Sequence, residues 1–75
     1  DMEKEIASKI IVDLYEMRVS TFHKYSSKSD LVIDSYKYSF FTSAIAQLCS
    51  KYKITDRDIE QELHKRKLED FPNQA

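Results

Sequence analysis

Apolar residues in the first third of the chain recur at spacings of three and four, the period of an amphipathic helix. The pattern predicts a helix from Glu3 to Tyr25. Its predicted buried face carries Ile6, Ala7, Ile10, Ile11, Leu14, Met17, Thr21, Phe22 and Tyr25. The opposite arc is polar, and Glu5 and Lys9 form a pair of opposite charge at i,i+4. Val12 and Val19 fall outside the main face, so they are either singly exposed valines or a second apolar strip for a partner.

A second apolar pattern runs from Asp30 to Tyr52 and predicts a second long helix. Its apolar face consists of Leu31, Tyr38, Phe41, Ala44, Ile45, Leu48, Cys49 and Tyr52. The β-branched and aromatic residues at 31–33 and 36–41 are also compatible with a strand. Helix is favoured because a single strand would find no partner strand elsewhere in the chain.

The polar cluster at residues 26–29 predicts a loop between the two long helices. Either Ser27 or Ser29 is suited to be the N-cap of the second helix, because a serine hydroxyl accepts hydrogen bonds from the free backbone amides. Asp30 lies three residues after Ser27 and complements the positive end of the helix dipole.

The clearest start signal belongs to a shorter third helix. Thr55 is the predicted N-cap, Asp58 lies in the first turn, and Ile54 and Ile59 are spaced as a hydrophobic staple across the cap. Few apolar residues follow apart from Leu63, so we expect this helix to dock weakly or fray. Pro72 disfavours helix at the residue before it, and residues 72–75 are a predicted tail.

The chain contains no glycine and a single proline among its 75 residues, so little in its interior forbids helix. The predicted fold is all-α, an antiparallel helical hairpin of two long helices plus a shorter third helix, a small bundle forming one domain over residues 1–71. A chain of this size buries only about 60 to 65% of its surface on folding, so its stability is marginal.

Composition indicates a folded protein in a reducing compartment. Apolar residues make up 41%, charged residues make up 33%, and the formal net charge is −1, which excludes the signature of disorder. The only cysteine, Cys49, cannot close an internal disulfide. No run approaches the roughly 18 apolar residues of a membrane span, and the first residues lack a signal-peptide pattern. These features predict a soluble, cytoplasmic protein.

The candidates for catalysis and metal binding are few. Cys49 falls on the predicted core face and His23 falls on a polar arc. The two residues are therefore not expected to form a pair of nucleophile and base. Glu60 and His64 are spaced i,i+4 on one helix face, but two ligands do not make a metal site. The sequence therefore predicts no enzymatic activity, no metal and no cofactor.

The two long helices carry more apolar surface than the thin stripe of the third helix can cover. A protein partner or a second copy of the chain is expected to cover the remainder. The candidate interface consists of Val12, Val19, Asp34, Tyr36, Lys37 and Phe40. Asp34 lies within an apolar stripe, so it either protrudes with the first turn beyond the neighbouring helix or meets a partner together with Lys37.

The favoured function is a small helical protein-interaction module, an adaptor, inhibitor or regulatory subunit that acts by binding a protein partner or by homodimerisation. The alternative is an accessory nucleic-acid-binding module that uses the region from 51 to 67 together with exposed tyrosines. Its candidate contacts are Lys51, Lys53, Arg57, Lys65, Arg66 and Lys67. Acidic residues interrupt this region, and it carries no recognised nucleic-acid-binding signature.

Overall fold

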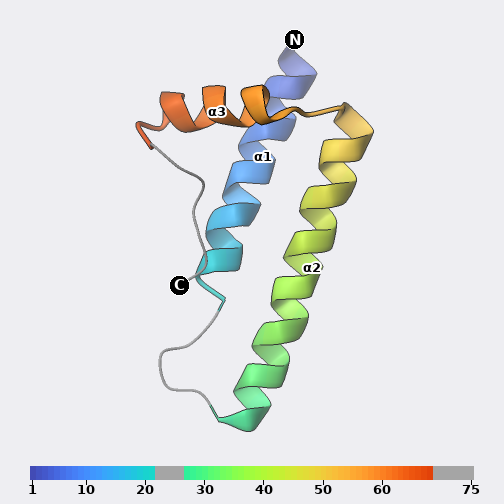
Figure 1. The fold of residues 1–75 in the computed structure, drawn as a ribbon, viewed down its shortest axis with the longest axis vertical. Helices are drawn as coiled ribbons and strands as arrows, with labels where there is room; N and C mark the ends of the chain where they lie inside the picture. The colour runs from blue at the N-terminus through green and yellow to red at the C-terminus, as the bar shows by residue number, and fades with distance from the viewer. Residues whose placement is uncertain (22–26, 69–75) are drawn as a thin grey trace.

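The computed structural model describes residues 1–21 and 27–68, which form three helices and, over these ranges, no strand. Helix α1 spans Met2–Val19, α2 spans Lys28–Tyr52 and α3 spans Asp56–Lys65. Helices α1 and α2 lie side by side and antiparallel, and α3 crosses the N-terminal half of α1 (Figure 1). The predicted all-α architecture is confirmed, and the strand alternative for residues 31–33 and 36–41 is wrong.

Helix α1 is shorter than predicted, and two hydroxyl groups explain where it ends. The side chains of Ser20 and Thr21 both donate to the carbonyl oxygen of Met17, at 2.9 and 3.1 Å. A continuing helix would use this carbonyl for the backbone amide of Thr21, which instead bonds Arg18. The predicted core positions Phe22 and Tyr25 lie outside the described residues.

The starts of α2 and α3 follow the sequence closely. Ser27 is the N-cap of α2, with its hydroxyl accepting from the amide of Asp30 while the Asp30 carboxylate accepts from the amide of Ser27. Thr55 and Asp58 make the same reciprocal pair at α3. Both capping boxes satisfy backbone amides that would otherwise lack partners.

The core is built around α1, which packs against both other helices, whereas the backbones of α2 and α3 do not approach each other. Ile11 and Val12 of α1 are fully buried, and they cluster with Ile45 of α2 and with Ile59 and Leu63 of α3. The expectation that α3 docks weakly is therefore wrong, because its two apolar residues are each only 3% exposed.

The buried face of α1 differs from the predicted one. Ile6, Ile10 and Met17 were expected in the core, but they are between 44 and 54% exposed. Val12, expected outside the main face, is fully buried. The physical reason is that α1 contacts α2 on one side and α3 on another. This orientation leaves the side of α1 that carries Ile6, Ile10 and Met17 exposed to solvent.

The capping box of α3 predicts an acid-sensitive contribution to stability. Hydrogen bonds from the backbone amide and the hydroxyl of Thr55, at 2.8 and 3.0 Å, hold the pKa of Asp58 below its usual range. Because the folded-state pKa is the lower one, the stabilisation is complete above the unfolded value of about 3.9 and is lost as pH falls through the folded value. We expect Asp58→Ala to lower the urea midpoint at pH 7 and the difference from wild type to shrink towards pH 2.

The matched control is Glu60→Ala, which removes an exposed carboxylate of the same helix that takes no part in the box. Its effect on the urea midpoint should be smaller at pH 7. A difference between Asp58→Ala and wild type that stays constant from pH 7 to pH 2 would contradict the role given to the Asp58 carboxylate.

Candidate protein interface

The structure separates the six predicted interface residues into buried and exposed ones. Tyr36 and Phe40 are 75 and 67% exposed, and Lys37 is exposed beside them. Val19 is half-buried. The prediction that Val12 and Asp34 are accessible to a partner is wrong, because both are fully buried within the chain.

The two corrections have different causes. Val12 is covered because it packs in one cluster with Ile59 and Leu63 of α3. Asp34 lies on the side of α2 that faces α1, eleven residues and about three turns before Ile45, so it neither protrudes nor meets solvent. A wheel of one helix cannot reveal either covering, since each depends on neighbouring segments of the chain.

A set of exposed apolar side chains runs along the flank of α1 that α3 leaves uncovered. Ile6, Ile10 and Met17 are spaced by four and seven residues, which returns them to the same side of the helix. Val12, which packs with α3, is turned by about 160° from Ile10 at 3.6 residues per turn. The exposed isoleucines therefore lie on the side of the hairpin away from α3.

Two grooves between α1 and α2 join this flank to α2. The first groove is lined by Glu3, Ile6, Ala7 and Ile10 of α1 with Leu48 and Tyr52 of α2. The second is lined by Met17, Ser20 and Thr21 with Lys37 and Phe41. Phe40 continues the second groove, since its ring meets that of Phe41 edge to face at a centroid distance of 5.8 Å. We call the surface formed by Ile6, Ile10, Met17, Phe40, Phe41 and Leu48 the open face.

A second apolar surface lies at the start of α2, which extends past the end of α1 (Figure 1). It is lined by Leu31, Val32, Ser35, Tyr36 and Ser39. Tyr36 follows Asp34 by two residues, so its side chain is turned by about 160° from the side that faces α1. We call this surface the α2 tip.

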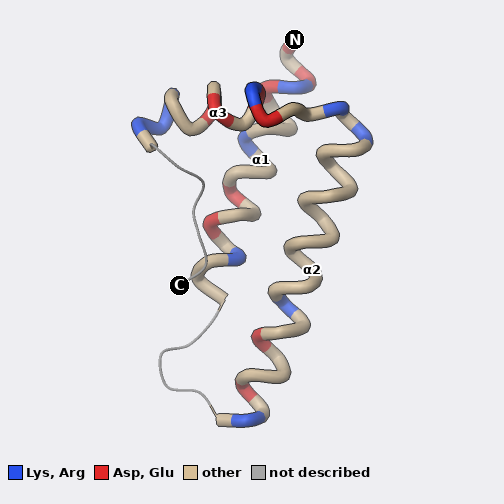
Figure 2. The backbone as a smooth tube through the Cα atoms, viewed as in Figure 1, with Lys and Arg blue, Asp and Glu red and all other residues tan. Residues whose placement is uncertain are grey.

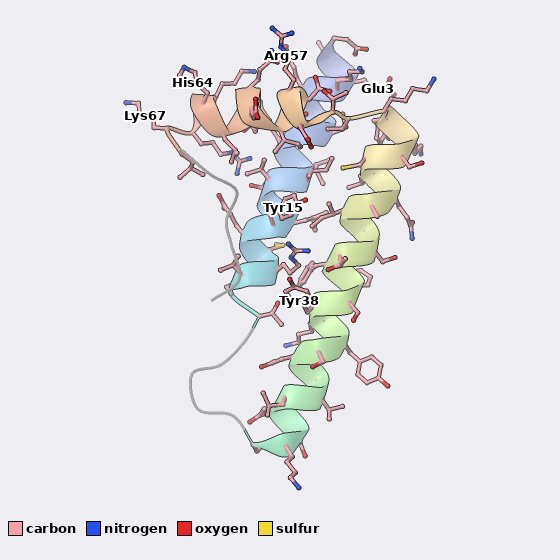
Figure 3. All side chains as sticks on the ribbon, viewed as in Figure 1. Glu3, Tyr15, Tyr38, Arg57, His64 and Lys67 are labelled. Carbon is pink, nitrogen blue, oxygen red and sulfur yellow. The ribbon has the colours of Figure 1, made fainter. Side chains whose placement is uncertain are left out.

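Arg18 is a structural residue that sequence reasoning missed. Its guanidinium carbon lies 4.9 Å from the ring centroid of Tyr15 and 4.7 Å from that of Tyr38, and its Nη1 donates to the hydroxyl of Thr42 at 3.1 Å. Figure 3 shows both tyrosines at the contact between the long helices. Arg18 thus holds α1 to α2 through its cation–π contact with Tyr38 and its hydrogen bond to Thr42, while Tyr15 lies on the same helix as Arg18. Its helical position, one turn after Leu14 and two turns after Ile11, was the available signal.

The basic residues of the alternative function form two groups. Lys51, Lys53 and Arg57 lie where α2 meets α3, and Lys65, Arg66 and Lys67 lie at the far end of α3 (Figure 2). The nearest members of the two groups, Arg57 and Lys65, are eight residues apart in α3, which is about 12 Å along the helix. The ammonium of Lys51 lies 5.4 Å from the ring centroid of Tyr52.

Arg66 is turned inward rather than towards solvent. Its Nε donates to Glu62 at 2.7 Å and its Nη1 to Asp13 at 2.7 Å, while Nη2 donates to the backbone carbonyl of Lys9 at 3.1 Å. Glu16 is a weaker fourth partner at 3.4 Å. The guanidinium charge is therefore neutralised within the chain, and Arg66 contributes little to a phosphate-binding surface.

The remaining candidates for chemistry lie apart. Cys49 is half-buried, and burial together with the charge of Asp56 raises the pKa of its thiol, which disfavours the nucleophilic thiolate. Glu60 and His64 are exposed on α3, and His23 lies outside the described residues. Over residues 1–21 and 27–68, no three potential metal ligands cluster, and no helix has the length and apolar character needed to cross a membrane.

Comparison of the chain with protein-family models, with curated proteins and with solved structures finds no match. The surface of the molecule and its chemistry therefore provide the evidence for function.

Proposed function

We propose that the protein is an interaction module, an adaptor, inhibitor or regulatory subunit, that acts by binding a protein partner or a second copy of itself through the open face. The observation that carries this proposal is an imbalance of apolar side chains. Among the described residues, ten large apolar side chains are at least 39% exposed, whereas six apolar residues are buried. The exposed ones are Met2, Ile6, Ile10, Met17, Leu31, Val32, Ile33, Tyr36, Phe40 and Leu68. Ile6, Ile10, Met17 and Phe40 of this set belong to the open face, and exposed apolar side chains gathered on one face mark interaction sites.

The open face is the better of the two apolar surfaces for a stable contact because it draws on both long helices. Burying a whole side chain of this size is worth about 1.5 to 3 kcal/mol, so covering the exposed half of Ile6, Ile10, Met17 and Phe40 gains about 3 to 6 kcal/mol in total. Association costs at least about 4 kcal/mol. A partner must therefore also fill the two grooves, which favours a partner that inserts side chains from a helix of its own.

Nucleic-acid binding has weaker support. The neutralised Arg66, the separation of the basic groups and the acidic side chains between them leave no continuous cationic stripe among the described residues. A phosphate-binding surface would weaken steeply as salt rises, whereas an apolar interface would respond little.

The proposal is tested by capture from the source cell on immobilised wild type and two variants. Ile10→Asn places an amide in the open face, and Val32→Asn makes the same kind of change at the α2 tip, where the side chain is similarly exposed. Lysate is applied after nuclease treatment, at low and at moderate salt. We expect specific proteins on wild type and on Val32→Asn, and at least a tenfold loss on Ile10→Asn.

Circular dichroism melts of all three proteins show whether both variants stay folded. Material that disappears after nuclease treatment or at moderate salt would instead support the nucleic-acid alternative. Loss of binding in Val32→Asn but not in Ile10→Asn would move the interface to the α2 tip and contradict the open face.

A further inference from the structure

We infer that the open face binds a second copy of this chain. The two hairpins pack with their open faces together and run in opposite directions, so the Glu3 end of one copy lies at the Lys37 end of the other. The inference rests on the proposed function and names its partner. The resulting dimer has two layers of two helices, one layer from each copy, with α3 on each outer side. A two-fold axis across the middle of the open face generates this arrangement.

The size of the open face fits such a dimer. Helix α1 has 18 residues and is about 27 Å long, and two adjacent helices together are about 20 Å wide. A face of these dimensions covers about 540 Å² per copy and about 1,100 Å² in both, close to the roughly 1,200 Å² at which stable interfaces begin.

The charges that border the grooves favour the reversed orientation. Glu3 is the charged residue of the groove at the N-terminal end of α1, and Lys37 is the charged residue of the groove at the other end. Reversal brings Glu3 of one copy to the end that carries Lys37 in the other. Pairing like ends would bring the two Lys37 side chains together. Lys51, near the Glu3 end, already has its ammonium over the ring of Tyr52.

A small residue lies where two α2 helices must approach. Ala44 comes four residues after Phe40 and four before Leu48, so it shares the open face with them. It lies near the middle of the contact between α1 and α2, where the two-fold axis passes, and a methyl group allows two helix backbones to come close. Ala46, two residues further on, is exposed and points away from this face.

The test uses engineered thiols in a Cys49→Ser background. Ala44→Cys and Ala46→Cys are each oxidised with oxidised glutathione and separated without reducing agent. A disulfide requires two Cα atoms within about 7 Å of each other. In the dimer the two copies of residue 44 meet this limit because both lie near the two-fold axis, whereas the two copies of residue 46 point away from the interface. We expect at least fivefold more linked dimer for Ala44→Cys than for Ala46→Cys. Equal linking, or more for Ala46→Cys, would overturn the inference.

Sedimentation equilibrium gives the second measurement. We expect the wild-type chain to dimerise in the micromolar range and Ile10→Asn to raise the dissociation constant at least tenfold. Glu3→Lys and Lys37→Glu should each raise it about 3- to 10-fold, because rim charges contribute modestly, and the double variant should return it to within about twofold of wild type. Failure of the double variant to recover binding would overturn the reversed orientation.

The outcomes separate this inference from the proposed function. A chain that stays monomeric up to millimolar concentration while Ile10→Asn still abolishes protein capture overturns the dimer and leaves the proposed function standing. A monomeric chain that captures no protein through the open face overturns both.

Discussion

Ile11→Ala should cost the protein about 2 to 5 kcal/mol of unfolding free energy, the usual range for truncating a fully buried aliphatic side chain. Ile11 is 0% exposed and packs in the cluster that joins all three helices. A domain of this length has roughly 4 to 11 kcal/mol of stability in all, so one substitution removes a large share of it. Urea denaturation followed by circular dichroism at 222 nm measures the loss.

The adjacent isoleucine provides a matched control, because Ile10 is 44% exposed on the open face. Ile10→Ala makes the same chemical change in the same helix, and it should cost less than about 1.5 kcal/mol, since little of the side chain leaves a packed environment. The comparison is made at protein concentrations where the chain is monomeric. Equal losses for the two variants would contradict the observed orientation of α1.

Arg66→Met should give the second large effect, about 2 kcal/mol of destabilisation. The reason is Glu62, which is 5% exposed and loses the guanidinium that neutralises it at 2.7 Å. A buried carboxylate without its cation is costly, but the Arg66 side chain retains 24% exposure, so water screens part of the penalty. The melting temperature measures the loss.

Two further variants identify the cause of that loss. Lys65→Met removes a cation from the neighbouring exposed position and should change the melting temperature little. Glu62→Met combined with Arg66→Met removes both charges and should recover most of the stability, because an apolar pair of similar volume replaces the buried ion pair. A double variant as unstable as Arg66→Met alone would show that the contacts of Arg66 with Asp13 and Lys9, not the buried and unpaired charge of Glu62, carry the effect.

Local signals in the sequence predicted the helix starts well. The capping boxes at Ser27 and Thr55 involve residues three positions apart, so their geometry is encoded within one turn of helix. The end of α1 was harder to predict. The hydroxyl groups of Ser20 and Thr21 terminate it, but Ser20 also fits the polar arc of a longer amphipathic helix and Thr21 also fits its buried face.

The interface residues were predicted only in part because burial depends on the neighbours of a helix. Tyr36, Lys37 and Phe40 are exposed, as a surface site requires, whereas Val12 disappears beneath α3. The helical wheel of α1 contains two apolar strips, and the weaker one includes Val12. The wheel alone cannot show that α3 covers Val12 while Ile6 and Ile10 of the main strip stay exposed to solvent. Long-range contacts, which periodicity does not encode, set that choice.

The position of α1 between two helices whose backbones stay apart has a consequence for biosynthesis. The segments of α1 and α2 leave the ribosome before that of α3. In the nascent hairpin, Val12 is therefore exposed to solvent until the segment from Asp56 to Lys65 has emerged. The hydrophobic cluster is completed only after α3 has been made. Nascent hairpins on neighbouring ribosomes therefore expose additional apolar surface through which they can aggregate. A run of slowly translated codons before residue 56 would lengthen the time for which this surface is exposed.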